Sequence, residues 1–135
     1  MPNHDLITIN LWDAIEGQFG GFDVEPLGRS LYRMADIPSV LFRPHDIEYG
    51  DLVELEPVAA NTYEIRGVRQ RSGWRRFDFG ISLEWAASEA FQRLMSNVQE
   101  NGGLCMRDFG GCLSIVLPPD STWDPTDDVR SGGPA

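Results

Sequence analysis

Residues 22–37, FDVEPLGRSLYRMADI, contain the pattern that decides the fold. Apolar and acidic residues alternate in the first half of this stretch, which is typical of a half-buried strand, and the second half is expected to be its hairpin partner. A three-residue loop pairs Val24 with Met34 and Glu25 with Arg33, whereas a two-residue loop would place Val24 opposite Arg33. The sequence therefore predicts an antiparallel hairpin with the longer loop.

Strand-like runs flank this hairpin on both sides. Residues 6–12 predict a first strand, and residues 52–58, 62–71 and 74–82 alternate apolar and polar side chains between turn residues. We expect the last three runs to form a meander that closes a small, strongly twisted antiparallel sheet or half-open barrel.

A single main helix is predicted at residues 83–101, with Ser82 as its N-cap. Strands at 104–107 and 112–117 follow it and complete a βαββ unit. The fold class is therefore α+β. The helix has one apolar stripe, formed by Ala87, Phe91, Leu94 and Val98. We expect a core that contains Phe77, Phe79, Ile81, Phe91, Leu94, Val98, Ile115 and Leu117.

The chain is expected to have three parts. Residues 1–82 form a β-rich lobe, and residues 83–119 add the helix and a β-hairpin that complete the same domain. Residues 120–135 are a C-terminal extension, in which Asp124-Pro125 begins a helical turn through Val129. The last five residues, SGGPA, are predicted to be a disordered tail.

The charge of the chain excludes several classes of partner. It has 21 acidic residues and 11 basic ones, all arginine, for a net charge of −10. Such a field repels phosphate, so we expect no binding to nucleic acid or to an anionic membrane surface. No membrane-length apolar run or export signal is present, and Cys105 and Cys112 are expected to be buried free thiols, so a cytoplasmic location is predicted.

Catalytic and metal-binding patterns are scarce. The two histidines, His4 and His45, have no spacing that pairs them with a nucleophile, so we predict no enzyme activity, no cofactor and no metal site. Glu54 and Glu56 share one face of a predicted strand. They form either an acidic, partner-facing surface or a pair that does acid–base or metal chemistry.

An arginine cluster interrupts the acidic sequence at residues 65–76, which hold five arginines and no acid. A two-residue turn at Ser72-Gly73 would make this cluster a hairpin, with possible cation–π contact. The hairpin would have three cross-strand pairs: Arg71–Trp74, Arg69–Arg76 and Val68–Phe77.

Facing arginines repel each other, so an anion is expected beside this hairpin. Glu54 and Glu56 on the neighbouring strand are one source. The other is a ligand or partner, such as a phosphate or an acidic peptide.

Five short motifs carry a family resemblance: Glu25-Pro26-Leu27-Gly28, Leu31-Tyr32-Arg33, Ile37-Pro38, Gly50-Asp51-Leu52-Val53-Glu54 and Arg71-Ser72-Gly73. With them the chain resembles, over residues 6–119, the bacterial family "domain of unknown function 4265". The resemblance implies a small N-terminal β-barrel joined to a βαββ unit and brings no activity. Trp74 departs from the family pattern, in which a small polar residue or His follows Ser-Gly.

We expect a non-catalytic acidic binding protein, of the immunity or antitoxin type, that neutralises a cognate bacterial toxin by direct contact. Its partner is expected to be a basic toxin or effector domain, and the chain itself a monomer or weak homodimer. A small-molecule or peptide sensor that uses the Arg69–Trp74 hairpin or the barrel mouth is the alternative. The predicted partner-binding residues are Glu54, Glu56, Arg69, Arg71, Trp74 and Arg76.

Overall fold

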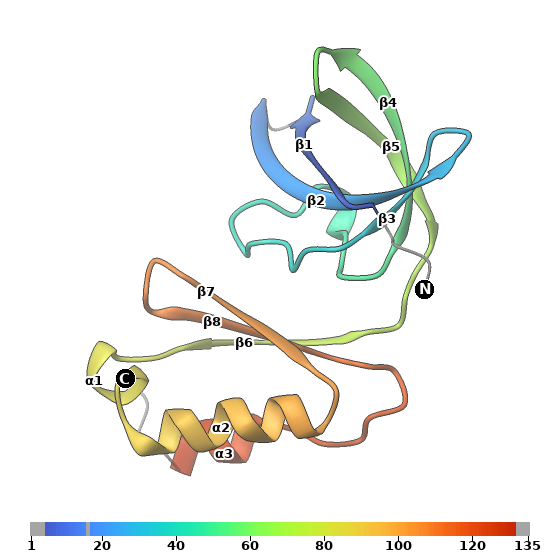
Figure 1. Ribbon diagram of the computed structural model, residues 1–135. Coiled ribbons are helices and arrows are strands. Elements are labelled where there is room, and N and C mark those ends of the chain that lie inside the picture. Colours follow the sequence, from blue (N-terminus) through green and yellow to red (C-terminus); the bar gives the residue numbers. More distant parts are fainter. Residues whose placement is uncertain (1–4, 16, 132–135) are drawn as a thin grey trace. The chain divides into compact units, whose positions relative to one another are not determined.

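The computed structural model describes residues 5–15 and 17–131 (Figure 1). The chain divides into two compact units between Ser72 and Gly73. This division falls earlier than the expected lobe boundary after residue 82, because the strand that follows Ser72-Gly73 pairs within the second unit. The fold is α+β and consists mostly of strands, as the sequence indicates.

The first unit is a closed barrel rather than a half-open one. Its closure comes from the first and last strands, which pair in parallel through Asn10–Thr62, Leu11–Tyr63 and Trp12–Glu64. The predicted hairpin register, with Val24 opposite Met34 and Glu25 opposite Arg33, is confirmed. The barrel strands, in order, are β1 (Ile7–Asp13), β2 (Gln18–Gly28), β3 (Leu31–Met34), β4 (Leu52–Ala59) and β5 (Thr62–Gln70).

Alternation along these strands fills the barrel interior. Every second residue of β1, β2 and β4 points inward, so apolar side chains meet inside and polar ones face outward. One interior residue, Ile47, comes from the long connection between β3 and β4. The buried core of this unit comprises Ile9, Leu11, Phe22, Val24, Met34, Ile47, Val53, Leu55 and Ile65.

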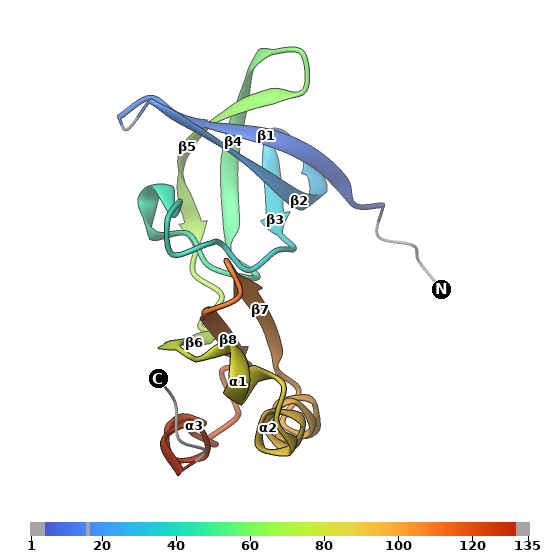
Figure 2. The same cartoon turned by 90° about the vertical axis from the view of Figure 1, so that its left-hand side faces the viewer.

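The second unit is a three-stranded sheet with the strand order β6-β8-β7. Helices pack on one face of this sheet, as Figures 1 and 2 both show. The strands are β6 (Arg75–Gly80), β7 (Leu104–Asp108) and β8 (Cys112–Leu117), and the helices are α1 (Leu83–Ala86), α2 (Glu89–Glu100) and α3 (Thr126–Ser131).

The predicted meander is wrong in its third strand. β6 does not pair with β5; it pairs with β8, and Phe77 lies opposite Ile115. The reason is the apolar face of β6, whose residues Phe77, Phe79 and Ile81 pack in the core of the second unit against β8 and the helices. Phe77 therefore belongs to the core of the second unit and not to the barrel, because the apolar stripe of the helix packs on an apolar sheet face.

The single predicted helix is two helices. Ser82 caps α1 as expected, by accepting a hydrogen bond from the Trp85 backbone N–H at 3.0 Å. The chain then leaves the helical conformation at Ser88, whose hydroxyl caps α2 through the Phe91 N–H at 3.3 Å. A second serine cap inside the apolar stripe thus divides the helix.

The predicted core residues all lie in the core of the second unit. Phe77, Phe79 and Phe91 are half-buried at its margin, and the other five are buried. Both cysteines are free, as predicted, but their predicted burial is wrong: Cys105 is exposed and Cys112 half-buried, because β7 is an edge strand of the sheet and Cys112 only begins β8. The helical turn after Pro125 is confirmed as α3, and residues 132–135 of the predicted tail lie outside the described residues. None of the described helices has the length and apolar character needed to cross a membrane.

Candidate functional site

An open groove lies at one end of the barrel, where β1 and β5 end and β2 begins. One wall is the β1–β2 hairpin, with Asp13, Ile15 and Gln18, and the other is residues 40–46 of the β3–β4 connection. Figures 1 and 2 show this connection crossing the barrel end. The volume of this barrel-end groove is about 510 Å³.

Phe42 attaches the connection to the barrel. Its ring stacks on Phe22 with 5.8 Å between centroids and lies directly over the backbone of Gly20. A Cβ at Gly20 would lie 2.3 Å from Phe42 Cδ2, closer than two carbon atoms approach without bonding. The absence of a side chain at Gly20 therefore makes room for the ring that positions the groove wall.

The rim of the groove has an unusual backbone. His45 and Asp46, in the short helical turn η1 (Pro44–Asp46), both have left-handed conformations, with φ of 57° and 54°. Two consecutive non-glycine residues in this region are strained, and such strain persists only where surrounding contacts enforce it.

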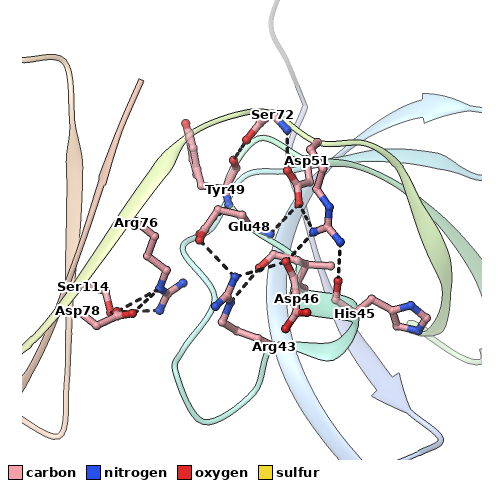
Figure 3. Close-up of polar contacts among 12 residues, drawn as sticks. Arg43, His45, Asp46, Glu48, Tyr49, Asp51, Ser72, Arg76, Asp78 and Ser114 are labelled. Atoms are coloured by element: carbon pink, nitrogen blue, oxygen red, sulfur yellow. Dashed lines mark hydrogen bonds and ion pairs between the residues drawn. The ribbon is translucent and has the colours of Figure 1, made fainter. Parts of the chain in front are cut away.

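Two arginines supply those contacts (Figure 3). Arg71 donates from Nη1 to the Asp46 carbonyl oxygen at 2.6 Å and from Nη2 to the His45 carbonyl oxygen at 3.0 Å. Arg43 donates from Nε to the Ile47 carbonyl oxygen at 3.1 Å. A side chain directly after β5 and one from the connection itself thus fix the rim.

Buried carboxylates continue this network under the rim. The Asp51 side chain, only 1% exposed, accepts hydrogen bonds from the Glu48 N–H at 2.9 Å, the Ser72 N–H at 2.7 Å and Arg71 Nη1 at 3.2 Å. Glu48 in turn accepts from Arg43 Nη2 at 3.5 Å. A buried carboxylate that accepts several hydrogen bonds holds its donors in one geometry, so the groove is pre-organised.

The groove combines exposed apolar walls with negative charge. Ile15 is 85% exposed and Leu41 65%. Asp13 and Asp46 lie in opposite walls, and within residues 5–15 and 17–131 no arginine forms an ion pair with either. Such a surface suits an apolar side chain that is accompanied by a cation.

Glu54 and Glu56 lie on the outside of the barrel, and each has an arginine partner on β5. Arg69 Nη1 lies 2.6 Å from Glu54 Oε1, and Arg66 pairs with Glu56. The first of the two anion sources considered from the sequence, neighbouring glutamates, therefore accounts for Arg69. These pairs are exposed and contribute little to stability.

The predicted Arg69–Trp74 hairpin does not exist, and its three cross-strand pairs are wrong. Ser72-Gly73 connects the two units, and Ser72 is tied to the first by a 2.6 Å hydrogen bond from its Oγ to the Tyr49 carbonyl oxygen. Arg71 therefore turns toward the groove rim, while Trp74 and Arg76 belong to the second unit. Arg76 bonds there to Asp78 at 3.1 Å and to Ser114 at 3.2 Å (Figure 3).

Sequence reasoning missed the groove. Residues 38–50 were expected to be an irregular connection because Pro38 and Pro44 interrupt them. The consecutive apolar residues Val40, Leu41 and Phe42 in such a connection were the available signal. The left-handed backbone at His45 and Asp46 has only a weak signature in the sequence, since histidine and aspartate adopt it more often than most residues but far less readily than glycine.

Metal binding has no support in the described part of the chain, where no group of three His, Cys, Asp or Glu side chains is arranged to hold an ion. No family model and no curated protein matches the chain, so membership of the family that its motifs resemble stays a prediction.

The fold, however, occurs in a known protein. A crystal structure of a hypothetical protein from Neisseria gonorrhoeae is similar with a TM-score of 0.61. The similarity covers 96% of this chain and 87% of that one at 14% sequence identity. At this identity it concerns the fold alone.

Proposed function

We propose that this protein is a non-catalytic, acidic binding module that holds a basic protein partner at the barrel-end groove. One observation carries the proposal: the groove places exposed aliphatic side chains beside Asp13 and Asp46, two carboxylates that no arginine of the described residues pairs with. The backbone of the groove rim is also fixed by a hydrogen-bond network. Exposed apolar patches with polar rims are typical of interaction sites. A pre-organised site also loses little conformational entropy when it binds.

The charge of the barrel unit supports a basic partner. Residues 1–72 contain 12 acidic residues and 6 arginines, for a formal charge of −6. Complementary charge accelerates encounter and disfavours acidic competitors. An immunity or antitoxin protein that blocks a basic toxin is the narrower form of this proposal, because toxins that act on nucleic acid carry the positive charge that this surface attracts.

The test is to produce the chain together with the product of the adjacent open reading frame, and to measure complex formation by calorimetry and growth of the host. We expect a 1:1 complex whose affinity falls as salt rises, and rescue of growth if the partner is a toxin. Absence of both a complex and rescue would contradict the proposal.

A small-molecule sensor is the second candidate. Since the Arg69–Trp74 hairpin does not exist, we place the binding site of this candidate at the groove. The groove volume, about 510 Å³, lies within the range of ligand pockets. Thermal unfolding with organic cations such as spermidine distinguishes the two candidates. A ligand at 100 times its Kd adds about 2.7 kcal/mol of stability, whereas a protein-binding groove should give no such shift.

A further inference from the structure

We infer that the barrel-end groove recognises one kind of peptide segment: an aliphatic residue with an arginine or lysine on each side. This inference rests on the proposed function and names the part of the partner that the groove receives. It follows from the side chains that form the two walls and from the direction of the arginine donors beneath them.

The walls fit an aliphatic anchor. Ile15 of the hairpin and Val40 and Leu41 of the connection are 85%, 39% and 65% exposed, although each is a large apolar residue. They line one groove, so a single aliphatic side chain can remove all three from water.

The carboxylates place the cations. Asp46 belongs to the connection wall and is exposed, and Asp13, only 7% exposed, lines the hairpin wall, so each wall contributes a carboxylate and Asp46 is the one that a cation reaches most easily. The Asp13 side chain accepts the Ile15 N–H at 3.0 Å and is therefore held in place. Asp46 uses its backbone carbonyl, and not its carboxylate, for the bonds to the arginines.

The arginines near the groove do not reverse this preference. Arg43 directs Nε and Nη2 to the Ile47 and Asp46 carbonyl oxygens and to Glu48. Arg71 directs its donors to His45, Asp46 and Asp51. Nε and Nη2 of Arg43 and both Nη atoms of Arg71 are thus engaged within the protein, and the carboxylates of the groove remain as acceptors for a ligand.

The test uses the full chain with 13C-labelled methyl groups and three acetylated, amidated pentapeptides: Gly-Arg-Leu-Arg-Gly, Gly-Glu-Leu-Glu-Gly and Gly-Arg-Gly-Arg-Gly. At concentrations up to about 10 mM, which reach the weak affinity of so short a ligand, the first should give saturable shifts of the Ile15, Val40 and Leu41 methyls. Val58 and Leu27, exposed outside the groove, serve as internal controls. The second peptide should give no shift, and the third should bind at least about tenfold more weakly.

Variants separate the two contributions. Leu41→Ser should weaken the first peptide about tenfold or more, and Asp46→Asn about threefold, as expected for an exposed charge pair. Asparagine also tolerates the left-handed conformation at position 46. Val58→Ser and Asp5→Asn, which change exposed residues outside the groove, are the matched controls and should leave the affinity unchanged.

Two outcomes with the peptides overturn the inference: no saturable shift with the Arg-Leu-Arg peptide, or equal binding of the glutamate peptide. If a basic partner protein still binds in either case, the proposed function stands and only its contact site is wrong. If the peptide binds the groove as expected and no partner protein is found, the site preference stands without the proposed function. Spermidine is the third case. If it shifts the same methyls and binds more tightly than the Arg-Leu-Arg peptide, the inference that the groove recognises a peptide is contradicted in favour of a small-molecule site.

Discussion

Arg71 Nη1 lies 2.6 Å from the carbonyl oxygen of Asp46, so the residue that directly follows β5 holds the strained rim of the groove. The same nitrogen lies 3.2 Å from the buried Asp51 carboxylate. One guanidinium group therefore joins the outer rim to the polar network beneath it. Because of these contacts, Arg71, which the sequence places in the arginine cluster, is a positioning residue for the rim.

Replacement of Arg71 by lysine should loosen the rim. One ammonium group cannot bond both the His45 and Asp46 carbonyl oxygens in the planar geometry that arginine provides. We expect a loss of about 1 kcal/mol in the free energy of unfolding. Amide exchange should become faster at Asp46 and Ile47, whose N–H groups bond to Arg43 and Pro44 within the turn.

The matched control is Arg69→Lys. Arg69 is a nearby exposed arginine, within β5, but its side-chain contact is an ion pair with Glu54. The free energy of unfolding and the free energies of local opening from amide exchange should both stay within about 0.5 kcal/mol of the wild-type values. Equal effects of the two substitutions would mean that Arg71 has no special role at the rim.

Gly20→Ala should displace Phe42. The new Cβ would lie 2.3 Å from the ring, so the ring must leave its place or the strand must shift. Overpacking of this kind reduces stability by about 1–3 kcal/mol. We expect that loss in chemical denaturation, together with loss of the Phe22–Phe42 ring contacts in NMR spectra.

The neighbouring Gly21 provides the control, because a Cβ there has no atom within 4 Å. Gly21→Ala should therefore change stability by less than about 1 kcal/mol. In a Phe42→Ala background, Gly20→Ala should lose most of its effect, since the closest ring is gone and only Phe22 Cε2, at 3.3 Å, remains near the new Cβ. A full loss of stability in that background would show that the ring is not the obstacle.

Local patterns predicted the local structure of the chain well. The register of the β2–β3 hairpin follows from matching Val24 with Met34, and β7 and β8 lie where alternation places them. The partner of β6 could not be predicted in the same way. Its alternation defines an apolar face but does not say which strand meets it, and the tight-turn residues Ser72-Gly73 favoured the wrong neighbour.

The candidate site was harder to predict for a related reason. Arg71 was singled out as a partner-binding residue, which stays a prediction, but its contacts lie more than 20 residues away in an irregular segment. Glu54 and Glu56 attracted attention because they share a strand face, yet arginines of β5 pair with them. A groove built from a connection depends on backbone angles and long-range hydrogen bonds, which hydrophobic periodicity does not record.

Ser88→Ala should weaken the boundary between α1 and α2. The Ser88 hydroxyl accepts the Phe91 N–H at 3.3 Å and donates to the Trp85 carbonyl oxygen at 2.5 Å. Loss of a serine N-cap reduces stability by about 1 kcal/mol. Ser96→Ala, at an exposed position inside α2, is the control and should be neutral or slightly stabilising. If both substitutions have the same effect, Ser88 is not the cap that separates the helices.

Asp36→Asn should change how the stability of the barrel depends on pH. Burial raises the pKa of Asp36 above its ordinary value, and the nearby charge of Asp23 adds to this, although a 2.6 Å hydrogen bond from the Asp23 N–H opposes it. The folded wild type therefore binds the proton more tightly than the unfolded chain. Its free energy of unfolding must fall as pH rises from the ordinary value of 3.8 through the raised one.

Asparagine lacks this titration but keeps an oxygen that can accept the Asp23 N–H. The stability of Asp36→Asn relative to the wild type should therefore increase between about pH 3 and about pH 7, as urea denaturation at several pH values would measure. Asp5→Asn, which removes one exposed charge of the same kind, controls for the change in net charge. A stability difference that stays constant or decreases over this range would mean that the Asp36 carboxyl is no harder to ionise in the folded protein than in the unfolded chain.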